Sequence, residues 1–151
     1  MVRKFGTLIY KNSIKLFLIF CVSLIPTISL ADNIVEVSDS RIELLIESNS
    51  IEPGDELLVG FKFSLSPGWH TYWVNPGDAG EGASIKWNLP KDVKASKILW
   101  PGPERIPVEP LMTFGYENEV VLLTKIYTSK NTDIPLTLKA LVRWYTCKEI
   151  C

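Results

Sequence analysis

Two cysteines near the end of the sequence, Cys147 and Cys151, form the group with the clearest capacity for chemistry. A disulfide between them closes a ring of about five residues, which stabilises a fold by about 2 kcal/mol in the chain-entropy model, against about 4.7 kcal/mol for a ring of 100 residues. A bridge that holds a domain together joins distant strands. This short spacing therefore predicts a reversible dithiol–disulfide pair as readily as a static staple.

The spacing alone leaves a structural disulfide and a metal site as alternatives. Two thiols and the only histidine, His70, are too few for a closed zinc site. Copper(I) could be bound by the two thiolates together with Met112, although nothing in the sequence places Met112 beside them. No other cofactor is expected.

The start of the chain indicates export. Residues 1–15 are basic, residues 16–30 form an apolar run, and Ser29 and Ala31 are small residues at the −3 and −1 positions of a cleavage site. The run is shorter than the roughly 20 apolar residues that cross a membrane. We therefore expect residues 1–31 to be a cleaved signal peptide and residues 32–151 to be a single domain in the periplasm, where disulfides persist.

The charge of that domain excludes one class of function. Four of the 16 Lys and Arg residues lie in residues 1–31, which contain no acid, so the rest of the chain carries 12 bases against 17 acids. An acidic domain without a basic patch is a poor nucleic-acid binder.

Short alternating segments predict an all-β fold, an immunoglobulin-like antiparallel β-sandwich. The clearest is Glu56–Leu65, in which every second residue is apolar. The other predicted strands are Ile34–Val37, Arg41–Glu47, His70–Val74, Ser84–Leu89, Lys94–Leu99, Val120–Thr128 and Leu136–Thr146. The Pro-rich segment Trp100–Pro110 cannot be a central strand and is expected to be an extended connection.

The predicted strands indicate where the candidate functional residues lie. Alternation along Leu136–Thr146 places Cys147 on the outward face at the end of the strand. His70 follows a turn and begins a strand, which favours a surface or core-edge histidine over a catalytic base. The Gly-rich segment 75–82 lacks the ending of a phosphate-binding loop and is expected to be a turn or loop.

Four motifs occur in an order that resembles one family. They are PGWHTYWVNPGDAGEG (residues 67–82), WNLP (87–90), WPGPER (100–105) with FGY (114–116), and WYTCKEIC (144–151). Together, from about Ile42 to Cys151, they resemble the amino-terminal periplasmic domain of the thiol:disulfide interchange protein DsbD, and most closely the branch that includes the copper-sensitivity suppressor ScsB.

The resemblance implies an immunoglobulin-like domain with one redox-active cysteine pair, and Cys147 and Cys151 match that pair. In the family the domain takes electrons from a membrane-embedded domain and passes them to periplasmic thioredoxin-like proteins, disulfide isomerases and cytochrome c maturation factors. The second cysteine, here Cys151, forms the mixed disulfide with the partner.

The resemblance also implies residues that surround the pair. An aromatic residue in a loop caps the disulfide, and the matching segment is residues 112–116, with Phe114 or Tyr116 as the cap and Tyr72 beside the site. We expect this segment to be a Gly-containing turn that acts as a mobile lid. Better-known members space the cysteines more widely and continue into a membrane domain, so the sequence is expected to be a carboxy-terminally incomplete member.

Overall fold

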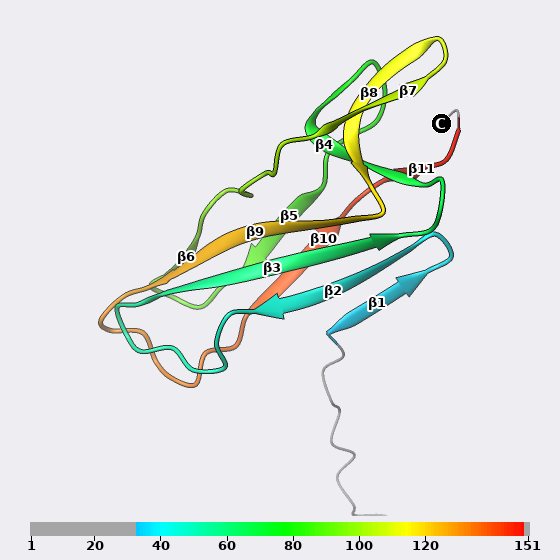
Figure 1. Ribbon diagram of the computed structural model, residues 1–151. Coiled ribbons are helices and arrows are strands. Elements are labelled where there is room, and N and C mark those ends of the chain that lie inside the picture. Colours follow the sequence, from blue (N-terminus) through cyan, green and yellow to red (C-terminus); the bar gives the residue numbers. More distant parts are fainter. Residues whose placement is uncertain (1–32, 150–151) are drawn as a thin grey trace, which may run out of the picture. The chain divides into compact units, whose positions relative to one another are not determined.

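The computed structural model describes residues 33–149, so the predicted signal peptide and Cys151 lie outside the described residues. The described residues form eleven strands and no helix (Figure 1). The strands are β1 (Ile34–Val37), β2 (Ser40–Ile46), β3 (Glu56–Leu65), β4 (His70–Gly77), β5 (Ser84–Asn88), β6 (Val93–Ala95), β7 (Glu104–Val108), β8 (Leu111–Glu117), β9 (Glu119–Thr128), β10 (Lys139–Arg143) and β11 (Thr146–Cys147). No helix within residues 33–149 is long and apolar enough to span a membrane.

One layer is a five-stranded antiparallel sheet in the order β1-β2-β3-β9-β6. Its centre is the long ladder between β3 and β9, which runs from the pair Glu56–Tyr127 to the pair Ser64–Glu119. Figure 1 shows β2, β3 and β9 running side by side. This sheet provides the rigid base of the domain.

Alternation in β3 builds the core. Every second side chain is buried, and Phe63 has no exposed surface, so the predicted face is confirmed. The buried residues of that face are Leu57, Val59, Phe61, Phe63 and Leu65. Phe61 packs against Trp87 of β5 with ring centroids 5.9 Å apart, which joins the five-stranded sheet to a second layer.

The second layer consists of two smaller sheets, β10-β5 and β11-β4-β8-β7. The chain enters the four-stranded sheet after β3 and leaves it between β8 and β9, where Asn118 has a φ of 58°. At this crossing the Leu65 amide donates to the Asn118 carbonyl over 2.7 Å, which holds the two passages together. The predicted all-β antiparallel architecture is confirmed.

Two expectations about the strands are wrong. Residues 112–116 are not a turn, because they lie within β8, which pairs with β4 on one side and β7 on the other. The Pro-rich connection also contains a strand, β7, although its position at the edge of the sheet agrees with the exclusion of a central strand. Pro107 is tolerated there because an edge strand needs hydrogen bonds on one side only.

The predicted strand Leu136–Thr146 is divided in two. β10 pairs with β5, the ladder stops at Trp144 and Tyr145, and β11 then pairs with β4 in the other sheet. The side chain of Trp144 explains the break. Its ring packs edge-on against Phe63 at 6.1 Å, and its Nε1 donates to Ser40 Oγ over 3.2 Å.

Candidate functional site

Cys147 is the last residue of β11 and is disulfide-bonded. The strand pairs with β4, with Thr146 opposite Thr71 and Cys147 opposite His70. Only 1% of Cys147 is exposed. The sulfur is therefore held by a sheet, and a partner cannot approach it from solvent without movement of what covers it.

Side-chain hydrogen bonds fix β11 from two directions. Thr71 Oγ1, on β4, donates to the carbonyl of Tyr145 over 2.8 Å. Thr146 Oγ1 donates to Asp39 Oδ2 in the turn between β1 and β2. A strand of two residues has few ladder bonds of its own, so these side chains supply the anchoring that positions Cys147.

The predicted exposure of Cys147 is wrong. Alternation counted from Leu136 places it outward only if one strand continues to the end. The break at Trp144 and Tyr145 instead moves the chain into the four-stranded sheet, where Cys147 is buried. The pairing of Cys147 with Cys151 remains a prediction, because Cys151 lies outside the described residues.

His70 lies on the same face as Cys147, because directly opposed residues of antiparallel strands share a face. It is 2% exposed, so it is not a surface residue, and it lies outside the hydrophobic core cluster, as a core-edge histidine would. Its Nε2 is buried without a hydrogen-bond partner. Burial lowers the pKa of His70 from its ordinary value of 6.5, and the carboxylate of Glu117, its partner on β8, opposes that shift. The imidazole is thereby favoured in its neutral form.

Tyr72 shares this face, two residues along β4 from His70. The two rings meet edge-to-face, with centroids 5.1 Å apart and planes at 84°. Gly80 covers the tyrosine so closely that a Cβ on it would lie 2.2 Å from the Tyr72 ring. Burial also raises the pKa of Tyr72, so the phenol stays neutral. Of the aromatic residues predicted near the pair, Tyr72 is the one placed on the face of Cys147.

Tyr116 and Phe114 lie elsewhere. Tyr116 is opposite Thr71, on the other face of the sheet, and belongs to the hydrophobic core. Its hydroxyl donates to the Pro101 carbonyl over 2.8 Å, and burial raises its pKa to about 12. Phe114 is half-buried and lies against Gly77, where an added Cβ would be 3.1 Å from its ring. Their predicted capping role is untested, but the structure does not bring either ring onto the face of Cys147.

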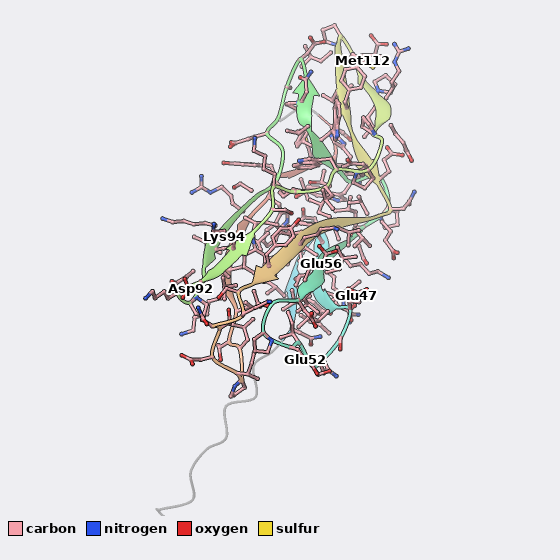
Figure 2. The ribbon with its side chains drawn as sticks, turned by 90° about the vertical axis from the view of Figure 1, so that its left-hand side faces the viewer. Glu47, Glu52, Glu56, Asp92, Lys94 and Met112 are labelled. Atoms are coloured by element: carbon pink, nitrogen blue, oxygen red, sulfur yellow. The ribbon has the colours of Figure 1, made fainter. Side chains whose placement is uncertain are left out.

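Met112 lies at the far end of β8 from the cysteine. Figure 2 shows it at the opposite end of the domain from Glu52. Glu117, which pairs with His70, is five residues further along β8, or about 16 Å at the usual rise of a strand. Within residues 33–149, no three His, Cys, Asp or Glu side chains gather in a way that could hold a metal ion. Met112 therefore cannot be the third ligand of the copper(I) site that the sequence left open.

Comparison with known proteins decides the family. A family model described as "Thiol:disulfide interchange protein DsbD, N-terminal" matches residues 43–151. The chain belongs to this family. No curated protein matches it.

A solved structure supports the fold of this DsbD-family domain. The N-terminal periplasmic domain of ScsB from Proteus mirabilis matches with a TM-score of 0.60 and 24% sequence identity. The match covers 78% of this chain and 45% of that one, so the present chain spans about half the length of the ScsB domain. At this identity the likeness shows the fold, an all-β immunoglobulin-like arrangement.

One feature of the site was missed by sequence reasoning. His70 and Tyr72 are two residues apart in a strand, so the sequence already placed them on one face. The burial of His70 and its position opposite Cys147 depend on a pairing between residues 77 positions apart, which alternation within a single strand does not reveal.

Proposed function

We propose that this domain relays electrons from a membrane-embedded reductase to periplasmic thioredoxin-like or disulfide isomerase proteins, through a Cys147–Cys151 dithiol–disulfide pair. Membership of the DsbD N-terminal family supports thiol:disulfide interchange as the general activity. The observation that carries the residue assignment is the disulfide bond of Cys147 at the end of β11. Cys151 is four residues away, within easy reach of a strand end.

The chemistry needs no cofactor. In the reduced domain, the thiolate of Cys151 attacks a partner's disulfide and forms a mixed disulfide, with one partner sulfur leaving as a thiolate. Cys147 then attacks the sulfur of Cys151, which releases the second partner sulfur and closes the internal disulfide. Burial of Cys147 agrees with this order, since the cysteine that meets a partner must be accessible.

The competing function is a binding module with a structural disulfide, and the 1% exposure of Cys147 is the observation in its favour. A redox titration against dithiothreitol separates the two. A relay pair is expected above about −300 mV, whereas structural disulfides lie below that potential. A potential below that limit would reject the relay.

Single-cysteine variants test the order of attack. Cys147→Ser should trap a mixed disulfide with a thioredoxin-like protein through Cys151, and Cys151→Ser should trap little. The products are counted on a non-reducing gel after incubation with an oxidised partner. Equal trapping by both variants contradicts the assigned order, and trapping by neither contradicts the relay.

We propose further that the protein is exported and processed. The layout of residues 1–31 supports this, and the related ScsB domain is described as periplasmic. Amino-terminal sequencing of the periplasmic fraction should give Asp32 as the first residue. Recovery of an intact Met1 in a membrane fraction would contradict cleavage.

A further inference from the structure

We propose that His70 is the base that accepts the thiol proton of Cys147 when the reduced domain closes its disulfide. This assignment rests on the proposed function, because it concerns the second step of the exchange. It adds a catalytic residue to a reaction otherwise described by the two cysteines alone.

The position of His70 favours this proton transfer. His70 is directly opposite Cys147 in the β4–β11 pair, and such opposed residues have Cβ atoms about 4.5–5.5 Å apart on the same face. An imidazole ring extends over this distance, so its nitrogen can reach a sulfur on the neighbouring strand. The anchoring of β11 by Thr71 and Asp39 keeps the two side chains in register.

One ring nitrogen of His70 is available to accept the proton. His70 Nε2 has no hydrogen-bond partner, although His70 is only 2% exposed. Buried polar atoms are normally paired, because an unpaired one loses its hydrogen bonds to water and gains none in return. The unpaired nitrogen is explained if its partner is the hydrogen of the Cys147 thiol. That hydrogen exists only in the dithiol state.

The thiol of Cys147 needs a base within the protein. The thiolate is the attacking species, and Cys147 is shielded from solvent bases by its burial. The carbonyl of Glu149, 3.4 Å from Cys147 Sγ, can accept a hydrogen bond from the reduced thiol but cannot remove the proton. A neutral imidazole can, and His70 is held neutral in its buried position.

The charged and titratable groups around His70 are consistent with that task. On its face lie Tyr72 on β4, Glu117 on β8, and Cys147 on β11, while Glu104 on β7 lies opposite Gly115 of β8. Lys148 and Glu149 follow Cys147, with the Lys148 side chain near Gly68. Glu117 is the group that stabilises the imidazolium formed when His70 takes the proton.

Closure of the ring moves one proton and two electrons pairwise between named atoms. The Cys147 proton moves to His70, and the sulfur's electron pair forms the bond to Cys151. The bond between Cys151 and the partner sulfur breaks, and its electron pair leaves on the partner as a thiolate. The domain loses two electrons, the partner's disulfide gains them, and His70 returns its proton to solvent.

The test uses the reduced protein and 5,5′-dithiobis(2-nitrobenzoate), which releases one coloured thiolate when the mixed disulfide forms and a second when Cys147 closes the ring. In His70→Gln the second release should slow about 100-fold, a typical effect of losing a general base, while the first is unchanged. An unchanged second release contradicts the proposal. Equal slowing of both releases also contradicts it, since it assigns His70 a structural role.

A second variant keeps His70 in place. In Glu117→Gln the carboxylate that raises the pKa of His70 is gone, so the pH profile of the second release should move to lower pH, and an unmoved profile contradicts the proposal. Failure of the underlying relay gives a different result. The redox titration against dithiothreitol would then give the low potential of a structural disulfide, whatever the rate of the second release.

Discussion

The five-stranded sheet and the four-stranded sheet use their buried positions differently. In β3, the buried face is entirely apolar and its ladder with β9 is regular. In β4, the buried residues include His70, Thr71 and Tyr72, and the register with β8 is interrupted between Tyr72 and Gly77. The first sheet stabilises the fold by burying apolar side chains. The second has hydrogen-bonding and titratable groups in part of its interior, and these position a disulfide.

The largest loss of stability is expected from Phe63→Ala in β3, which belongs to the sheet with the apolar interior. Phe63 is completely buried, and its loss leaves a cavity that should lower the free energy of unfolding by about 3–5 kcal/mol. Urea denaturation measures the loss, and the exposed Val35→Ala in β1 is the control. Because Phe63 also packs against Trp144, just before β11, reduction of the disulfide should be faster in the folded variant. An unaltered rate would show that this contact does not hold β11 in place.

The second effect concerns Gly115→Ala in β8. A Cβ on Gly115 would lie 2.0 Å from the carbonyl oxygen of Thr71, so β4 and β8 must separate next to His70. We expect a stability loss of about 2–3 kcal/mol together with faster reduction of the disulfide by dithiothreitol. Gly102→Ala, which has open space around it, is the matched control. Equal behaviour of the two variants would contradict the close approach.

A smaller effect is expected from Thr146→Val, which keeps the shape of the side chain and removes its bond to Asp39. The loss should be about 1–2 kcal/mol, because the acceptor is the carboxylate of the buried Asp39. Thr137→Val, at an exposed site, controls for the substitution itself. Reduction of the disulfide should again be faster, and a variant that is destabilised without this change would show that Asp39 does not position Cys147.

The smallest effect is a dependence of stability on pH. Since the folded pKa of His70 lies below 6.5, the unfolded chain binds a proton first as the pH falls. The stability that His70 contributes is therefore fully present above pH 6.5. It declines as the pH falls below 6.5, towards the folded pKa. His70 is the only histidine, so His70→Gln should abolish this part of the slope in urea titrations across that range. A slope that persists in the variant must come from carboxyl groups instead.

The same contrast explains what sequence could predict. The buried face of β3 follows from its alternation, and β1, β3 and the start of β4 were predicted correctly. β7 and β8 were missed because their prolines and Gly115 are signals typical of turns, and only pairing with neighbours makes them strands. Tertiary context overrides such local preferences.

The candidate site was predicted in part for a related reason. Cys147 was chosen from residue type and spacing, which are local. Its burial and its neighbour His70 follow from the break at Trp144, where contacts with Phe63 and Ser40 end one strand and redirect the chain. Those contacts join residues far apart in sequence, so alternation counted along a single strand gave the wrong face.

Pro107 has a consequence for self-association. It lies in β7, the outermost strand of the sheet that contains Cys147, opposite Met112 of β8. An unprotected edge strand offers a row of amide donors to any extended chain, including another copy of the same protein. Proline has no such donor, so the row is interrupted in the middle of β7. Under the proposed function the domain meets other proteins only briefly, and this interruption discourages it from adding strands along its edge.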